Sequence, residues 1–474
     1  MQEMAQTLHF IVWGPWTMAL FLGTGLWFTV KSGGFQIRRI GYWWRMTAGS
    51  LWADDSGGGE DCGGGVVLDS HDSCDGTRRI TPFQSACTAL AATIGTGNIV
   101  GVATALTAGG PGALFWMWVS ALIGMATAYA ETSLGQQYRY RKPDGHWMCG
   151  PMVYMERGLG CRPLGTLYAF FAVCASLGMG SMVQSNSMSG TLEFGASVPP
   201  VVSAVVITAV TGAVVLGGIS RISSVSEKLM PVSAGIYLIF SLFVIMTSWN
   251  VLPKVMTAVF AGAFTPSAAG GGVAGFLLSR SVRYGMSRGV FSNEAGLGSL
   301  AVLHGAAEDT TPQQQGMWAM FEVFFDTVII CTLTALVILC VQFGGGGLPS
   351  GSDGAGLTAY CFSMRLGFVG EWLVSGAMVV FAFATIIAWY YLGRQTACYL
   401  AERIARRSDL ERNVEGFVKR SMKVYTVLYL AAVFSGCICR LDVVWMISDI
   451  WNGLMAYPNL LTLWILSGEV RFPR

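Results

Sequence analysis

Charged residues are scarce in this sequence. Only 12% of the 474 residues are Asp, Glu, Lys or Arg, while 53% are hydrophobic and the mean hydropathy is +0.54. A soluble domain carries about twice that share of charge, so the composition excludes a soluble globular protein. It predicts an all-α integral membrane protein that crosses the lipid bilayer several times. The net charge of +2 includes no basic stripe, which argues against a nucleic-acid partner.

Catalytic and nucleotide-binding motifs are also lacking. The four histidines are isolated, and the chain contains no H-E-x-x-H, G-x-S-x-G or G-x-x-x-x-G-K-[ST] pattern. These absences argue against an intramembrane enzyme and against an ATP-driven pump. A channel would usually show a repeated filter or a ring-forming signature, and the sequence has neither. No cofactor and no obligate protein partner are predicted.

Long apolar runs are abundant instead. Windows of about twenty residues predict eleven membrane spans. They lie near residues 9–30, 83–107, 113–137, 164–188, 198–217, 229–248, 272–303, 316–342, 370–392, 425–439 and 443–466. Most of the 29 Lys and Arg residues fall on one side of these spans, so we expect the N-terminus outside and the C-terminus in the cytoplasm of a plasma or inner membrane. The basic segment 394–424 is expected to lie along the inner leaflet's anionic headgroups.

A glycine-rich, acidic stretch at residues 49–79 separates the first span from the others. Its carboxylates, with Cys62 and Cys74, match no usual zinc spacing, so a flexible cytoplasmic insertion is the better interpretation. We therefore divide the single polytopic membrane domain into an extra N-terminal helix (1–48), this insertion, and two repeats of five spans (80–250 and 251–474). An odd number of spans in each repeat makes the repeats inverted.

Two apolar segments contain glycines that a plain spanning helix would avoid. Thr88–Gly101 includes Gly95, Gly97 and Asn98, and the segment Ser287–Leu300 lies about 190 residues further on. A helix that breaks at membrane depth exposes backbone N–H and C=O groups, which is tolerated only beside a protein-lined or water-filled cavity. Paired breaks in two repeats predict a binding site at their interface. The alternative is that the glycines serve only helix packing, as Gly97 and Gly101 could.

The exposed backbone groups suit a zwitterionic amino acid. Thr96, Gly97 and Asn98 would present N–H groups to its carboxylate, and the carbonyls around Phe291–Glu294 would accept from its ammonium group. Gln184 lies late in an apolar run, where its amide could hold the substrate or form an interhelical hydrogen bond. Trp389 could limit the site to short side chains or anchor a helix end at the membrane interface.

Four stretches together resemble the alanine or glycine:cation symporter family. They are TALAATIGTGNIVGVATAL, MVQSNS, MSRGVFSNEAGLGS and FAFATIIAWYYLG, which begin at residues 88, 182, 286 and 381. The resemblance covers the chain from about Thr81 to its end, with the first span also in place. It implies sodium-coupled, sometimes proton-coupled, import of small neutral amino acids. It also implies a LeuT-type fold: two inverted five-helix repeats, each with a discontinuous helix, after one extra helix.

The resemblance also implies particular ligands. The expected substrate site consists of Thr96, Gly97, Asn98, Gln184, Phe291, Asn293, Gly296 and Trp389. The expected sodium ligands are the carbonyls of Ala91, Ile94 and Phe381 and the hydroxyl of Thr385. Position 384 is alanine, where a serine hydroxyl is usual for the family. A glutamine or D-alanine carrier on the same scaffold is the alternative.

Several charges fall inside predicted spans, where each must pair or face water. Glu294 is expected to anchor a broken helix by accepting backbone N–H groups. Glu322 and Asp326 lie four residues apart and therefore on one helix face. Two like charges there need a cation, a proton or a polar partner. Proton coupling through this pair remains open.

Overall fold

Helices make up nearly all of the structure. The computed structural model describes residues 11–51, 79–143, 145–264, 280–347, 354–407, 413–439 and 441–473. Among these, the only strands are β1 (Tyr140–Arg141) and β2 (Trp147–Met148), which form an antiparallel hairpin. The all-α prediction is confirmed. The predicted insertion lies almost entirely outside the described residues.

Proline and hydrogen-bonding caps set where many helices begin. The first part of the chain forms α2 (Pro15–Lys31), α3 (Phe35–Arg38), α4 (Ile40–Met46), η1 (Ala48–Leu51), α5 (Pro82–Thr93), η2 (Gly97–Gly101), α6 (Val102–Gly109), α7 (Gly112–Tyr138), α8 (Pro151–Arg157), α9 (Arg162–Leu177), η3 (Gly178–Val183), α10 (Gln184–Ala196), α11 (Pro200–Val215), α12 (Gly218–Thr247), η4 (Trp249–Val251) and α13 (Leu252–Ala263). At α5, Pro82 occupies the first turn, and the Thr81 hydroxyl accepts from the N–H of Gln84.

Proline and a side-chain cap also begin a helix in the second part of the chain. It forms α16 (Arg280–Asn293), α17 (Ser299–Leu303), η5 (His304–Ala306), α18 (Pro312–Val323), η6 (Phe324–Cys331), α19 (Thr332–Phe343), α20 (Gly354–Leu366), α21 (Phe368–Arg407), α22 (Val414–Ile438), α23 (Leu441–Ile465) and η8 (Leu466–Glu469). Thr311 caps α18 as Thr81 caps α5, again with proline in the first turn. Three elements of the described fold, η2, η3 and η6, are π-helical: η3 and η6 interrupt longer helices, and η2 begins the stretch that continues as α6.

Six of the described helical stretches are long and apolar enough to cross a membrane, and the bent pair α5 and α6 could add a seventh span. The other predicted spans correspond to shorter or interrupted helices, such as α2, α11 and α16. The chain is therefore a multi-pass membrane protein, and the number eleven stays a prediction.

The basic segment 394–424 does not form a helix of its own. Helix α21 continues through it to Arg407, and α22 begins at Val414. Its charges therefore lie at the ends of two long helices that extend beyond their apolar parts. The expectation that this segment lies along the anionic headgroups of the inner leaflet stays a prediction.

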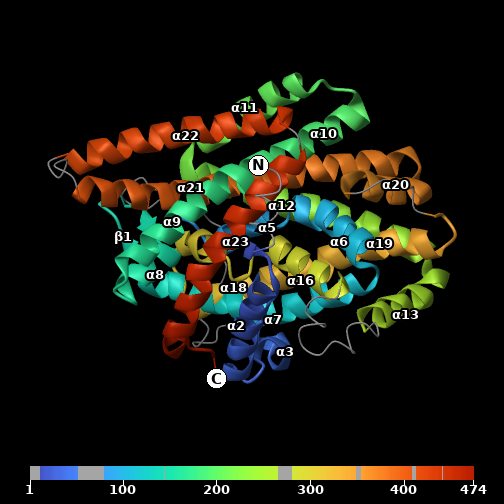
Figure 1. Cartoon of the computed structure of the whole chain (residues 1–474), viewed down its shortest axis with the longest axis horizontal. Helices are drawn as coiled ribbons and strands as arrows, with labels where there is room; N and C mark the ends of the chain where they lie inside the picture. Colours follow the sequence, from blue (N-terminus) through green and yellow to red (C-terminus); the bar gives the residue numbers. More distant parts are fainter. Residues whose placement is uncertain are drawn as a thin grey trace.

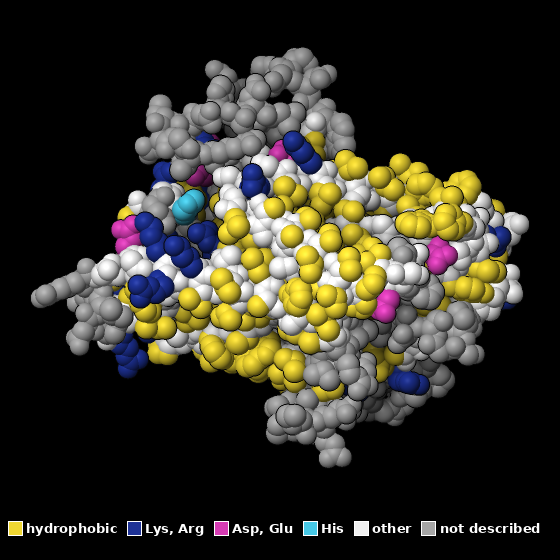
Figure 2. All heavy atoms as spheres, turned by 90° about the horizontal axis from the view of Figure 1, so that it is seen from above, with side chains coloured by type: hydrophobic (Ala, Val, Ile, Leu, Met, Phe, Trp, Pro, Cys, Tyr) yellow, Lys and Arg dark blue, Asp and Glu magenta, His cyan; other side chains and the backbone are white. Residues whose placement is uncertain are grey.

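The two predicted broken helices lie in the middle of the molecule. Figure 1 shows α6 and α16 there, with α22 and α11 along the upper edge and α2 and α3 along the lower. Helix α16 contacts both α6 and α7. Figure 2 shows hydrophobic side chains over most of one face, while Lys and Arg side chains gather towards its left end. That distribution is typical of a protein whose apolar belt lies in a bilayer.

Candidate functional site

The first break lies where the sequence predicted it. Helix α5 ends at Thr93, and Ile94 leaves the helical conformation with a ψ of 92°. In a continuous helix the N–H of Gly95 would donate to the carbonyl of Ala91, but here it donates to Oδ1 of Asn98 at 2.9 Å. The chain resumes helical turns at Gly97 and bends by 49° between α5 and α6.

The second break separates α16 from α17. It contains three residues with positive φ, namely Glu294 (56°), Gly296 (92°) and Gly298 (85°). Oδ1 of Asn293 accepts from the N–H of Ala295 at 3.1 Å. The N–H of Leu297 donates to the carbonyl of Glu294 at 3.0 Å, and the N–H of Gly298 donates to Oε2 of Glu131 on α7 at 3.1 Å. Glycine suits two of these positions because it adopts positive φ without strain.

The anchoring role predicted for Glu294 belongs to Glu131 instead. Glu131 also accepts from Nδ2 of Asn459 on α23, at 2.9 Å. Oε1 of Glu294 accepts from the indole Nε1 of Trp389, at 2.9 Å. The prediction was wrong because Glu131 is far from the break in sequence, and only tertiary packing brings its carboxylate to Gly298.

The two breaks meet each other at Gly97. An ideal Cβ placed on Gly97 would lie 3.2 Å from the Cα of Ser292, so glycine permits this close approach. Beside it, the N–H of Thr96 donates to Oε1 of Gln184 at 3.4 Å. The buried Thr96 hydroxyl has no hydrogen-bond partner among the described residues. Thr96, Gly97 and Gln184 thus lie together and can supply donors to a carboxylate.

Trp389 closes one side of this region. Its side chain is fully buried, which excludes the alternative of an interfacial anchor. It packs against η3, where a Cβ on Gly180 would lie 2.4 Å from the Cβ of Trp389. Its indole N–H points to Glu294 of the second break. The ring is therefore fixed between the segment that carries Gln184 and the break after α16.

Other predicted substrate residues direct their side chains elsewhere. Phe291 stacks on Trp445, with ring centroids 5.4 Å apart, and Nδ2 of Asn293 donates to Thr327 at 3.1 Å. Asn98 caps Gly95, and a Cβ on Gly296 would meet Phe21 and Leu460. Only backbone groups of Phe291 and Asn293 remain for a ligand. Their carbonyls lie in the last turn of α16, where helical partners are missing.

The segment that carries two of the predicted sodium ligands, Ala91 and Ile94, passes close to the helix that carries the other two, Phe381 and Thr385. An ideal Cβ on Gly95 would lie 2.6 Å from Oγ1 of Thr385, so the unwound segment passes directly against α21. The Thr385 hydroxyl donates to the carbonyl of Phe381 at 3.1 Å. Ala91 and Ile94 immediately precede Gly95 in the first break. These four residues can therefore offer oxygens to one cation between α5 and α21.

The acidic residues predicted as a pair have separate partners. Glu322 accepts from the Thr93 hydroxyl at 3.1 Å and lies 2.9 Å from Nε2 of His304. Asp326 contacts Asn98, Ser292 and Thr327. The π-helix η6 begins between the two carboxylates, at Phe324. Sequence reasoning missed His304, Ser292 and Thr327, although Ser292 lies inside the second glycine-rich segment.

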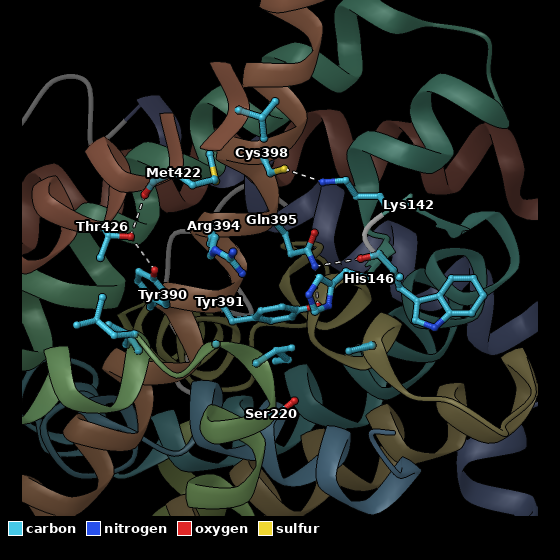
Figure 3. A pocket seen from close by; sticks show the side chains of 18 of the residues that line it. Lys142, His146, Ser220, Tyr390, Tyr391, Arg394, Gln395, Cys398, Met422 and Thr426 are labelled. Atoms are coloured by element: carbon cyan, nitrogen blue, oxygen red, sulfur yellow. Dashed lines mark hydrogen bonds between the residues drawn. The ribbon is translucent and has the colours of Figure 1, made fainter. Parts of the chain in front are cut away.

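A cavity lies on either side of this region. One, of about 430 Å³, is lined by residues that include Thr104, Ser187, Arg288 and Trp445. The other, of about 710 Å³, lies towards the basic end and is lined by residues that include Lys142, Arg394 and Tyr391. Figure 3 shows Arg394, Gln395 and Tyr391 together on α21 in this second cavity, opposite Lys142 and His146 of the β1–β2 region.

Known proteins share both this sequence and this architecture. The model of the sodium:alanine symporter family matches residues 1–472. The sodium/alanine symporter AgcS of Methanococcus maripaludis is 36% identical over 474 residues, which cover 99% of this chain and 95% of AgcS. An uncharacterized transporter of Haemophilus influenzae is 38% identical over 464 residues, covering 98% and 93% of the two chains.

Among solved structures, the transporter MhsT in complex with L-phenylalanine matches with a TM-score of 0.52 at 14% identity, covering 83% of this chain and 99% of MhsT. That likeness shows the LeuT-type fold, with its two discontinuous helices. The family match and the transporters among the relatives make this protein a transporter and not an enzyme. By the match along nearly its whole length, the chain belongs to the sodium:alanine symporter family of cation-coupled amino-acid transporters.

Proposed function

We propose that this protein imports alanine, and to a lesser extent glycine, together with sodium. The observation that carries the proposal is the contact between Gly95 and Thr385, where a Cβ would lie 2.6 Å from the hydroxyl oxygen. This contact puts the candidate ion ligands next to Thr96, whose N–H and hydroxyl suit the carboxylate of an amino acid. An ion bound there holds α5 against α21 and so fixes the substrate-binding backbone.

The amino acid would bind in a fixed orientation. Its carboxylate accepts a hydrogen bond from the N–H of Thr96, which in this structure donates to Oε1 of Gln184. The Thr96 hydroxyl, which has no partner among the described residues, adds a second donor. Its ammonium group faces the carbonyls at the end of α16. Trp389 leaves room only for a short side chain. The cavities on the two sides serve alternately as the route in from outside and the route out to the cytoplasm.

Uptake of labelled alanine into proteoliposomes tests this function. Accumulation is expected with an inward sodium gradient and not when potassium replaces sodium. Accumulation with potassium under an acid-outside pH gradient would assign the coupling to protons instead. If alanine fails under both gradients, uptake of glycine, glutamine and D-alanine distinguishes a different substrate on the same scaffold.

Substitution of Thr385 tests the ion site. Thr385→Ala removes a candidate oxygen ligand, so the sodium concentration for half-maximal uptake should rise about tenfold, as expected for the loss of a hydrogen bond to a charged group. Thr396→Ala is a matched control, because Thr396 lies on the same helix, is equally buried and donates to the carbonyl of Leu392. If the sodium concentration for half-maximal uptake is the same in the two variants, Thr385 is not part of the ion site.

A further inference from the structure

The larger of the two cavities has an excess of positive charge. Among the described residues that line its volume of about 710 Å³, Lys142, Arg394, Lys419 and Lys423 are basic, and Glu308 is the only acid. Figure 3 shows the side chain of Arg394 inside this cavity. The cavity lies at the end of the molecule that the distribution of Lys and Arg predicts to be cytoplasmic. Its charge therefore favours an anionic ligand on that side of the membrane.

Two of the four basic residues already have acidic partners. Nζ of Lys142 lies 2.8 Å from Oε1 of Glu402, and both side chains are largely buried. Nζ of Lys419 lies 3.4 Å from Oε1 of Glu415 one turn away on α22, where both side chains are exposed. An exposed pair of this kind is weak, so Lys419 can exchange its partner for a ligand, whereas Lys142 is held by Glu402.

Arg394 and Lys423 have no such partner. Neither forms an ion pair or a side-chain hydrogen bond with another described residue. Glu308, the acid that lines the same cavity, lies 3.9 Å from Nε of Arg79, so its charge is already matched. A partly buried guanidinium without a counter-charge gains from an anion that enters the cavity beside it.

Arg394 and Lys423 lie at the same level of two neighbouring helices. Helices α21 and α22 run antiparallel, and the hydroxyls of Tyr390 and Thr426 form a hydrogen bond between them at 2.8 Å. Arg394 lies about one turn after Tyr390, and Lys423 about one turn before Thr426. Because the helices are antiparallel, both cations are displaced towards the same end of the pair. They therefore face one part of the cavity.

Exposed apolar side chains adjoin this part of the cavity. Leu216 lines the cavity and is also strongly exposed. On α22, Val424, Val427 and Leu428 are exposed and share one helix face, which begins next to Lys423. A soluble phosphate compound would leave this apolar surface uncovered, whereas a phospholipid carries acyl chains that cover it. Basic pockets between spanning helices on the cytoplasmic side bind lipid headgroups in this way.

We propose that Arg394, Lys419 and Lys423 bind the phosphate of an anionic phospholipid from the inner leaflet. The guanidinium donates two parallel hydrogen bonds to phosphate oxygens, and the two ammonium groups add positive charge. The acyl chains lie along Leu216 and the exposed face of α22. The lipid links α21 to α22, and it neutralises cations along the proposed route to the cytoplasm. This inference does not depend on which amino acid or coupling ion the protein carries.

Thermal unfolding of the purified full chain in neutral detergent micelles tests the site. Phosphatidylglycerol added to the micelles should raise the midpoint temperature, because a ligand of the folded state stabilises it. Phosphatidylcholine with the same acyl chains, or inorganic phosphate at the same concentration, should leave the midpoint unchanged. An equal rise with inorganic phosphate would assign the cavity to a soluble phosphate compound and overturn the lipid site. No rise with phosphatidylglycerol, or an equal rise with phosphatidylcholine, would also overturn it.

Substitutions locate the lipid on the protein. Arg394→Gln and Lys423→Gln should each raise the phosphatidylglycerol concentration for half of the temperature shift about fivefold, because each removes one charge beside the phosphate. Lys423 is exposed, so its replacement should not impair folding. Arg420→Gln is the matched control, since Arg420 is an exposed cation on the same helix that does not line the cavity. If Arg420→Gln weakens binding as much as Lys423→Gln does, general surface charge attracts the lipid, and the proposed site is refuted.

Discussion

Gly95→Ala is expected to reduce sodium-driven alanine uptake strongly. The new Cβ would lie 2.6 Å from Oγ1 of Thr385 and 3.3 Å from Oε1 of Gln184. Both atoms must move, and they belong to the candidate ion site and the candidate carboxylate site. Overpacking of this kind costs about 1–3 kcal/mol. We therefore expect uptake to fall by about fivefold to 150-fold, measured as initial rates in proteoliposomes.

Gly101→Ala provides the control for this substitution. Gly101 lies in the same segment, six residues along, and an added Cβ there meets nothing within 4 Å. Alanine also favours a helix more than glycine does, so this variant should fold and transport like the wild type. If Gly95→Ala transports as well as Gly101→Ala does, the contact between the first break and α21 is not part of the transport cycle.

The position of both breaks could be predicted because each break carries a cluster of glycines together with an asparagine. Gly95 and Gly97 mark the first break, and the second lies at Gly296 and Gly298, where the backbone has positive φ. A local sequence signal is sufficient in such cases, because the residue that adopts the unusual backbone conformation is itself the glycine that permits it. The all-helical class followed in the same way from apolar windows.

The partners of the buried polar side chains could not be predicted. Asn98 and Asn293 were expected to face the substrate, yet one caps Gly95 and contacts Asp326, and the other caps Ala295 and contacts Thr327. The contacts with Asp326 and Thr327 each depend on a residue more than 30 positions away. The periodicity of the sequence does not show which amide contacts which carboxylate after the helices pack.

Packing between distant residues also explains why Glu131, and not Glu294, accepts a backbone N–H at the second break. Both are isolated acidic residues in apolar runs. The sequence around each does not show whether its carboxylate will accept from backbone N–H groups or from the N–H of an indole. The π-helical segments η3 and η6 were likewise not predicted. They change the direction of Gln184 and Asp326 relative to a regular helix, and Glu322 and Asp326 have different hydrogen-bond partners.

Replacement of Trp389 by leucine is expected to change which amino acids are carried. The indole fills the space between η3 and the second break, so its removal should admit a longer substrate side chain. One methylene in an apolar pocket is worth about 1–3 kcal/mol of discrimination. The ratio of uptake efficiencies for leucine and alanine should therefore rise at least about tenfold, measured by competition against labelled alanine.

Total transport should fall in this variant, because Glu294 loses the N–H that it accepts from Trp389. The ratio between substrates separates this loss from a change in specificity. Trp318→Leu is the control, since Trp318 is an equally buried indole on α18, where it packs against Phe321. It should lower the amount of folded protein without changing the ratio. A constant ratio in Trp389→Leu would mean that the indole only supports Glu294, and that substrate size is limited elsewhere in the site.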